Sequence, residues 1–280
     1  MTSTTLEYHD GGVRLKGLLV QPEKRSAGSA IVLFPDARGV GAHAIDCAGR
    51  LAALGYLTLV ADLYGEGILA RDMTHAGELM RGLRADVDRW RARAHASLEA
   101  LSRQQGVDRS RLAALGYCFG GGTALELARS GAPLAAVVSF HGVLASLRPA
   151  DAANIKARVL ICHGAADPLV PPAEVAAFEE EMGRTNVDWQ LHVYGGAVHA
   201  FTNPEAGAAG NAAFAYNETA DRRSWTACSV CCRKLSLSAA SVQPNYLILR
   251  RREAPSRRMG NRDSARTHPS RRGPTDRSSG

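Results

Sequence analysis

The sequence predicts an α/β fold, with a mostly parallel central sheet covered by helices on both faces. Short apolar runs typical of buried strands recur along the chain, and helical segments separate most of them. One of these strands leads into a helix through a glycine-rich turn at residues 115–122. Alternating strands and helices are typical of parallel sheets with both faces covered. Apolar residues make up 45% of the chain, which is ample for the core of a single domain.

The elements follow one another in a regular order. A β-hairpin is expected first, from residues 6–8 and 13–20. The later apolar runs predict strands at residues 31–34, 57–61, 112–115, 136–140, 159–162 and 190–194. A long helix is expected over residues 86–101. Nothing in the sequence indicates an internal repeat.

The turn after the strand at 112–115 carries the most informative residue, Cys118. It lies in a G-x-C-x-G pattern, with Gly116 and Gly120 on either side. This is the pattern of a nucleophile elbow, with a thiol where most elbows carry a hydroxyl. The nucleophile of such a turn has strained backbone angles, and its neighbours must be nearly free of side chains. The alternative is a glycine-rich turn with a buried cysteine, because Cys is commonly buried.

Two later loops carry the partners that a cysteine nucleophile needs. Asp167 follows the strand at 159–162, and His199 follows the strand at 190–194. The order nucleophile, acid, histidine is that of the elbow-containing hydrolases. Open α/β sheets place their sites at the carboxyl ends of the strands, so the three loops are expected to meet there.

The residue types suit one chemistry. A free thiol has a pKa of about 8.5, so a histidine must remove its proton near neutral pH, and a carboxylate must orient that histidine. The backbone N–H of Phe119, in the first helical turn, is aimed at a developing oxyanion. The N–H of Ala37, after the strand at 31–34, is the candidate for the second donor.

With these residues in view, the sequence resembles the dienelactone hydrolases, a branch of the α/β-hydrolase superfamily with a cysteine nucleophile. The resemblance spans about residues 8–225. It depends on the motifs at 34–39, 52–56, 61–65, 116–121, 163–168, 199–204 and 216–225. It implies an α/β-hydrolase fold in which Cys118, Asp167 and His199 are nucleophile, orienting acid and base. It also implies hydrolysis of a small ester or lactone through an acyl-cysteine intermediate, with no metal and no organic cofactor.

The chain departs from the family pattern at two places. The family often has Glu where this chain has Asp36, and that carboxylate is thought to help deprotonate the thiol. Asp36 is shorter by one methylene, and its simpler interpretation is a turn residue that accepts a local N–H. The family also binds a substrate carboxylate with arginines, one of them shortly after the catalytic histidine, where this chain reads Thr202-Asn203-Pro204. Arg38, Arg81 and Arg84 are alternatives, each also consistent with a solvated surface charge, so the substrate-binding residues stay unknown.

The sequence also suggests a cellular setting. The first residues lack the basic start and apolar core of a signal peptide, and no apolar run approaches the roughly 20 residues of a membrane span. A catalytic thiol favours a reducing compartment, so a cytoplasmic location is expected. Cys47 and Cys162 are interpreted as small core residues.

The last part of the chain differs from the rest. Residues 227–280 hold 12 Lys and Arg against 3 acidic residues, whereas residues 1–226 have a net charge of −2. We therefore expect a hydrolase domain over 1–226, for which no nucleic-acid groove is expected, and an atypical basic tail of disordered composition over 227–280. The family's final amphipathic helix is expected to be lost near 226–228, which suggests a frameshift and a sheet face left partly uncovered. Cys228, Cys231 and Cys232 lack the second cluster that a zinc site needs.

Three functions remain open at this point. The first is a cysteine-dependent hydrolase acting on a small-molecule ester or lactone. The second is a hydrolase-fold protein whose catalysis is impaired by the altered terminus or by Asp36. The third is a binding protein that uses the basic tail on a polyanion. The sequence does not indicate an oligomeric state.

Overall fold

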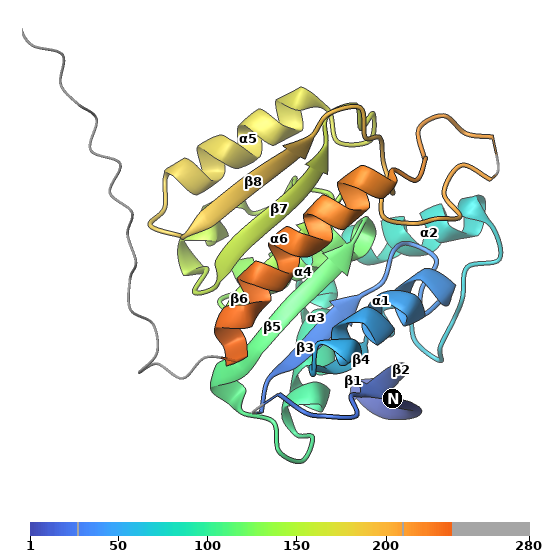
Figure 1. Cartoon of the computed structure of the whole chain (residues 1–280), viewed down its shortest axis with the longest axis vertical. Coiled ribbons are helices and arrows are strands. Elements are labelled where there is room, and N and C mark those ends of the chain that lie inside the picture. The colour runs from blue at the N-terminus through green and yellow to red at the C-terminus, as the bar shows by residue number, and fades with distance from the viewer. Residues whose placement is uncertain (27, 209, 237–280) are drawn as a thin grey trace, which may run out of the picture. The chain divides into compact units, whose positions relative to one another are not determined.

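The computed structural model describes residues 1–26, 28–208 and 210–236, and within them eight strands form a single sheet (Figure 1). The order across the sheet is β1-β2-β4-β3-β5-β6-β7-β8. The strands are β1 (Thr2–Asp10), β2 (Val13–Gln21), β3 (Ala30–Phe34), β4 (Leu57–Val60), β5 (Leu112–Tyr117), β6 (Ala136–Phe140), β7 (Arg158–Gly164) and β8 (Trp189–Tyr194).

The sheet is parallel except at one edge. β1 and β2 form an antiparallel hairpin, and β2 pairs antiparallel with β4. From β4 across to β8 every neighbouring pair is parallel. The predicted α/β-hydrolase fold is confirmed, and each predicted strand is present, although the two strands of the hairpin are longer than expected.

Helices cover both faces of the sheet (Figure 1). On one face, α1 and α6 pack over a buried layer that includes Ile31 and Leu115. On the other, α3, α4 and α5 pack over the alternate residues of the same strands, such as Val32 and Ala114. The helices are α1 (Ala42–Ala53), α2 (Met73–Arg84), α3 (Val87–Ser102), α4 (Phe119–Arg129), α5 (Pro172–Gly183) and α6 (Glu218–Ser236), with short 3₁₀ turns at Arg109–Arg111 and Pro149–Asn154.

The last helix corrects the expected end of the domain. α6 does not stop near 226–228 but continues to Ser236. Its buried face repeats at helical spacing through Ala220, Ser224, Cys228, Cys232 and Leu235. Two of these positions are cysteines, which pack as small apolar residues and conceal the amphipathic pattern. The final helix is therefore present on the sheet face that was expected to be partly uncovered, and residues 237–280 lie outside the described part of the chain.

Buried charges hold α4, the helix that begins directly after Cys118. Arg129 Nε donates to Glu181 Oε1 of α5 at 2.7 Å, and Arg129 Nη1 donates to Glu126 Oε1 at 2.9 Å. All three side chains are at most 8% exposed. Removing one partner of such a buried pair leaves an uncompensated charge, which is strongly destabilising. The arrangement therefore holds the helix behind the nucleophile in one position.

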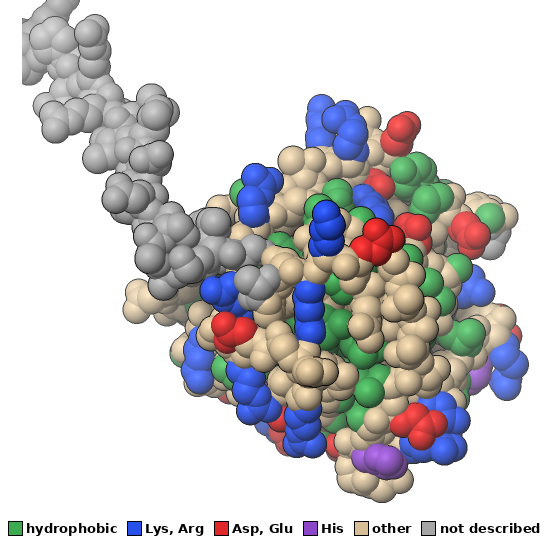
Figure 2. All heavy atoms as spheres, turned by 60° about the horizontal axis from the view of Figure 1, so that its bottom comes forward, with side chains coloured by type: hydrophobic (Ala, Val, Ile, Leu, Met, Phe, Trp, Pro, Cys, Tyr) green, Lys and Arg blue, Asp and Glu red, His purple; other side chains and the backbone are tan. Residues whose placement is uncertain are grey.

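The surface shows no strong segregation of charge where it is visible in Figure 2. On that face Lys and Arg side chains lie separately among neutral and acidic ones. Among the described residues, no helix is long and apolar enough to cross a membrane.

Candidate active site

Cys118 occupies a strained turn between β5 and α4. Its backbone lies at φ 53° and ψ −118°, a conformation that non-glycine residues rarely adopt. Its N–H donates to Phe140 O at 3.0 Å, and its carbonyl accepts the N–H of Gly121 at 3.0 Å, so the backbone is held on both sides. The side chain is partly exposed. This is the geometry that the sequence predicts for a nucleophile elbow.

The glycines of the turn allow strand and helix to approach closely. A Cβ at Gly116 would lie 1.9 Å from Gly120 O, and a Cβ at Gly120 would lie 2.1 Å from Phe34 O. Neither position tolerates any side chain without moving backbone. The G-x-C-x-G pattern therefore has a steric cause, in addition to the strain at Cys118 itself.

Asp167 and His199 form a buried pair at the end of the sheet where the sequence expects them. Asp167 Oδ2 lies 2.8 Å from His199 Nδ1, and both side chains are at most 1% exposed. Asp167 Oδ1 accepts the N–H of Leu169 at 2.9 Å, which fixes the rotation of the carboxylate. The other ring nitrogen, His199 Nε2, is buried and has no hydrogen-bond partner among the described residues.

The ring of His199 is also tied electrostatically to Cys118. Burial lowers the pKa of His199, but the charge of Cys118 and the hydrogen-bonded Asp167 carboxylate outweigh this effect and raise the pKa to about 10. The imidazolium form is thus favoured whenever the thiolate is present. The structure brings Cys118, Asp167 and His199 together, with Nδ1 of the histidine held by the acid and Nε2 without a hydrogen-bond partner among the described residues.

A short bridge positions the histidine loop. The N–H of His199 donates to Ala213 O at 3.1 Å, and the N–H of Ala215 donates to His199 O at 3.2 Å. The rings of Phe214 and His141 contact the imidazole edge-on, with centroids at 5.4 and 5.2 Å. The imidazole is therefore held by backbone pairing as well as by its neighbours.

Both expected oxyanion donors lie at the ends of elements beside Cys118. Phe119 is the first residue of α4, so its N–H has no partner within the helix. Ala37 follows β3, and its carbonyl accepts the hydroxyl of Tyr64 at 2.9 Å. That bond fixes the peptide after Ala37 and restrains the loop that carries the second N–H.

Tyr64 is a site residue that the sequence analysis does not identify, although it lies in the motif at 61–65. Burial raises the pKa of Tyr64, and the charges of Cys118 and Asp36 raise it further. Its ring stacks on Phe119 with centroids 6.2 Å apart. Asp62 organises the surrounding turn by accepting the N–H groups of Tyr64 and Gly65 at 3.0 and 2.8 Å.

Asp36 accepts a local backbone N–H, as expected for a turn residue. Its Oδ1 accepts the N–H of Arg38 at 2.8 Å. Its Oδ2 lies 3.6 Å from Nδ1 of His43, a residue of α1 that the sequence analysis does not identify. His43 lies in α1, which begins after the loop, and no known motif links its position to that of Asp36.

The three candidate arginines have other surroundings. Arg38 is exposed, and Arg81 Nε donates to Gly77 O of its own helix at 3.1 Å. The guanidinium of Arg84 lies over the Trp90 ring at 5.8 Å, and Trp90 stacks on Phe119 at 5.5 Å. Arg84 thus borders the aromatic residues behind the elbow. Among the described residues, no group of His, Cys, Asp and Glu is arranged to hold a metal ion.

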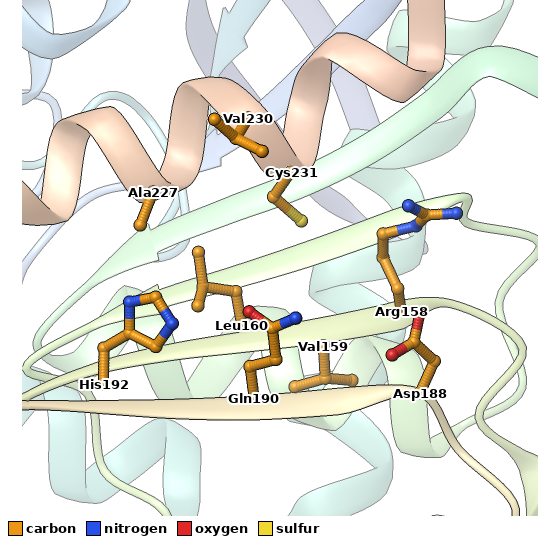
Figure 3. Close-up of a pocket in the computed structure, with 9 residues that line it drawn as sticks. All are labelled: Arg158, Val159, Leu160, Asp188, Gln190, His192, Ala227, Val230 and Cys231. Atoms are coloured by element: carbon orange, nitrogen blue, oxygen red, sulfur yellow. The ribbon is translucent and has the colours of Figure 1, made fainter. Parts of the chain in front are cut away.

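A cavity of about 270 Å³ lies elsewhere, between α6 and the strands β7 and β8 (Figure 3). Leu160, His192 and Cys231 line it, together with Arg158 at the amino end of β7. Asp167 follows the opposite end of that strand, so the cavity is separate from the Cys118 centre. It is the space that α6 leaves beside the edge strand.

Comparisons with known proteins find similarity to dienelactone hydrolases. A model of the dienelactone hydrolase family matches residues 15–233, which extends past the expected boundary at 226. The chain is 46% identical to the solved structure of m3DLH, with a TM-score of 0.81, over 84% of this chain and 98% of that one. It is 44% identical to a dienelactone hydrolase-like promiscuous phosphotriesterase from metagenomic libraries, with a TM-score of 0.79, over 84% and 97%. A candidate carboxymethylenebutenolidase of Yersinia pestis is 28% identical, over 68% of this chain and 75% of that protein.

Proposed function

The chain belongs to the dienelactone hydrolase family and is an ester or lactone hydrolase, and we propose that it works through an acyl-cysteine on Cys118. The observation that carries this proposal is the buried Asp167–His199 pair, whose Nδ1 is held at 2.8 Å while Nε2 has no partner among the described residues. A histidine held in this way is oriented to take a proton from a neighbouring nucleophile.

The first half of the reaction follows from these roles. The proton of the Cys118 thiol passes to His199 Nε2, and Asp167 stabilises the imidazolium that forms. The thiolate attacks the carbonyl carbon of the substrate, and the N–H groups of Phe119 and Ala37 receive the oxyanion. When the tetrahedral intermediate collapses, the alkoxide or enolate leaves with the proton of His199. The acyl group then remains on Cys118 as a thioester.

The second half regenerates the thiol. A water molecule gives one proton to His199 Nε2 as its oxygen attacks the thioester carbonyl. The same two backbone N–H groups receive the oxyanion, the carboxylic acid product leaves, and the thiolate recovers its proton. Asp36 belongs to this proposal as an assisting carboxylate, in the loop after β3 that also carries the Ala37 N–H.

The proposal extends to the setting of the enzyme. The substrate is a small molecule with an activated ester or lactone carbonyl, and no residue is assigned to grip a substrate carboxylate. We place the protein in the cytoplasm, because a catalytic thiol is retained best in a reducing compartment.

The test is turnover of p-nitrophenyl acetate and of dienelactone by the full chain, with mass spectrometry of the protein during turnover. We expect activity and an acyl adduct on Cys118 in the wild type. Cys118→Ala should lose both, with at least about a 10³-fold fall in kcat/KM, because the residual rate comes from binding and the oxyanion donors alone. Cys231→Ser, a second partly buried thiol away from the centre, is the matched control and should keep full activity.

Each other result has a definite meaning. Turnover that survives in Cys118→Ala contradicts the acyl-cysteine mechanism. A folded wild type without activity on either substrate favours a catalytically impaired hydrolase-fold protein. If polyanion binding then disappears on deletion of residues 237–280, the basic tail is the functional part.

A second candidate activity is hydrolysis of phosphotriesters. It is favoured by the 44% identity to the promiscuous phosphotriesterase, which is covered over 97% of its length. The Cys118 thiolate would attack phosphorus and expel an aryloxide, and water would then release the phosphoryl group from sulfur. Turnover of paraoxon that falls with Cys118→Ala supports this activity, and the absence of turnover at high enzyme concentration excludes it.

A further inference from the structure

A series of polar contacts runs from Asp36 through the helix α1 to His141, whose ring packs against that of His199. Asp36 Oδ2 lies 3.6 Å from His43 Nδ1, and His43 Nε2 lies 3.3 Å from Thr202 Oγ1. Thr202 Oγ1 lies 2.8 Å from His141 Nε2. His141 then contacts the ring of His199 edge-on, with centroids 5.2 Å apart. Thr202, His141 and His199 are at most 2% exposed, so water does not replace these contacts.

The hydroxyl of Thr202 sets which groups donate and which accept along this series of contacts. It has one proton, so it donates to only one of the two histidines and accepts from the other. Burial lowers the pKa of His43, but the Asp36 carboxylate and Cys47 outweigh this effect and raise the pKa to about 10. Burial and the charges of His199 and His43 lower the pKa of His141. His43 is therefore the charged donor, and neutral His141 accepts the Thr202 proton.

The other neighbours of His43 do not compete for its Nδ1. Cys47 Sγ, one turn later in α1, lies 3.5 Å from Nε2. Tyr117 of β5 packs edge-on against the ring with centroids 4.9 Å apart. Nδ1 itself is buried and makes no hydrogen bond in the described part of the chain, and the Asp36 carboxylate lies 3.6 Å from it.

We propose that His43 is a positioning residue for the Cys118 centre: it holds the Asp36 carboxylate through Nδ1, and Thr202 and His141 support it from behind. The proposal rests on the proposed function in one respect, the role of Asp36 beside the thiol. Asp36 Oδ1 is fixed by Arg38 N, so the direction of its charge depends on what holds Oδ2. Held by His43, the carboxylate keeps the direction from which it assists the thiol. Released, it would lose that direction, and Cys118 would give up its proton less readily.

Two substitutions at one position separate positioning from charge. Asn places its amide nitrogen near the position of Nδ1 and keeps a donor to Asp36, whereas Gln reaches the position of Nε2 and contacts Thr202 instead. Both remove the positive charge. The difference between the two variants therefore measures the effect of the contact with Asp36. The readout is the pH dependence of Cys118 alkylation by iodoacetamide in the full chain. This readout needs no substrate turnover.

For His43→Gln we expect the pH at which the alkylation rate of Cys118 is half-maximal to rise by about one unit. Near neutral pH the reaction should then be roughly tenfold slower. His43→Asn should move by less than half as much. Thr202→Val, which keeps both His43 and Asp36, should cause a smaller upward shift, and Thr202→Ser should restore the wild-type profile. His95→Gln is the matched control, since its Nε2 contacts only Ser130 Oγ at 2.7 Å, away from the centre.

A double-mutant cycle makes the test specific to Asp36. In an Asp36→Asn background, His43→Gln should cause no further shift, because the charge that it holds is gone. Equal shifts in His43→Asn and His43→Gln would overturn positioning and leave a charge effect only. Wild-type profiles in both variants, or in Thr202→Val if His43→Gln fails to fold, would also overturn the proposal. A shifted profile in a protein that hydrolyses no ester would support the inference while contradicting the proposed function.

Discussion

Two aspartate–histidine pairs follow the carboxyl ends of strands in the central sheet, and they are built differently. Asp167 and His199 are fully buried and 2.8 Å apart. Asp36 and His43 are 3.6 Å apart, and the Asp36 side chain is 22% exposed. In both pairs burial lowers the pKa of the histidine, and its partners raise it to about 10. Similar proton affinities thus arise from a tight pair and from a loose one.

The difference lies in the second ring nitrogen. His199 Nε2 has no hydrogen-bond partner among the described residues and is influenced by Cys118. His43 Nε2 is occupied by Thr202 at 3.3 Å and by Cys47 at 3.5 Å. His43 Nδ1 also makes no hydrogen bond in the described part of the chain, but it lies 3.6 Å from the Asp36 carboxylate, so this ring can orient Asp36 while Thr202 and Cys47 occupy its other nitrogen. The comparison teaches that proton affinity alone does not distinguish a base from a positioning residue.

The largest expected effect comes from breaking each pair at its carboxylate. Asp167→Asn should lower kcat/KM for p-nitrophenyl acetate by roughly 10³- to 10⁴-fold, because an amide no longer selects the tautomer that His199 needs. Asp36→Asn should lower it by about tenfold or less, because Asp36 acts beside the thiol and does not hold the base. Equal losses in the two variants would contradict the division of roles. Asp46→Asn, an exposed residue of α1, is the control.

The pH dependence of stability should sharpen the comparison. A histidine whose pKa is raised on folding contributes fully below its unfolded value near 6.5, and the contribution is lost as the pH rises toward 10. We therefore expect the free energy of unfolding to fall between pH 6.5 and about 9.5, by up to roughly 3–4 kcal/mol for each of these two histidines. Urea unfolding at a series of pH values measures the fall.

The carboxylate variants assign that fall to the separate pairs. Asp167→Asn and Asp36→Asn should each flatten the dependence, since each removes one cause of a raised histidine pKa. Neither should abolish it, because Cys118 still acts on His199 and Cys47 on His43. Curves parallel to the wild type in both variants would show that these histidines do not bind protons more tightly in the folded protein.

The sequence predicts the parts of the site that depend on local order. Cys118 is identified by glycines whose absent side chains make room for backbone atoms, and Asp167 and His199 by their places after strands. His43, Thr202 and His141 are not identified, because they come from three separate segments and meet only in the folded chain. Tyr64 lies in a recognised motif, but its bond to Ala37 depends on how two loops pack.

The end of the domain is where the sequence misleads. The Cys228–Cys232 region suggested a broken helix, because cysteines at these positions read as a C-x-x-C cluster and not as an apolar face. In the structure the two sulfur atoms are 4.0 Å apart on the buried face of α6. Small apolar side chains at helical spacing bury as well as larger ones when the opposing surface is close. The change in composition therefore lies beyond the end of the helix and not within it.

The smallest expected effect concerns the loop that carries Asp36. Tyr64→Phe keeps the ring on Phe119 but removes the hydroxyl that donates to Ala37 O at 2.9 Å. We expect kcat to fall about three- to tenfold with little change in KM, because the Ala37 N–H acts on the oxyanion that forms only in the transition state. Tyr216→Phe, whose hydroxyl contacts Asp221 on the surface, is the control. A rise in KM with unchanged kcat would instead make Tyr64 a substrate contact, and the asymmetry between the two pairs would then lie in their histidines alone.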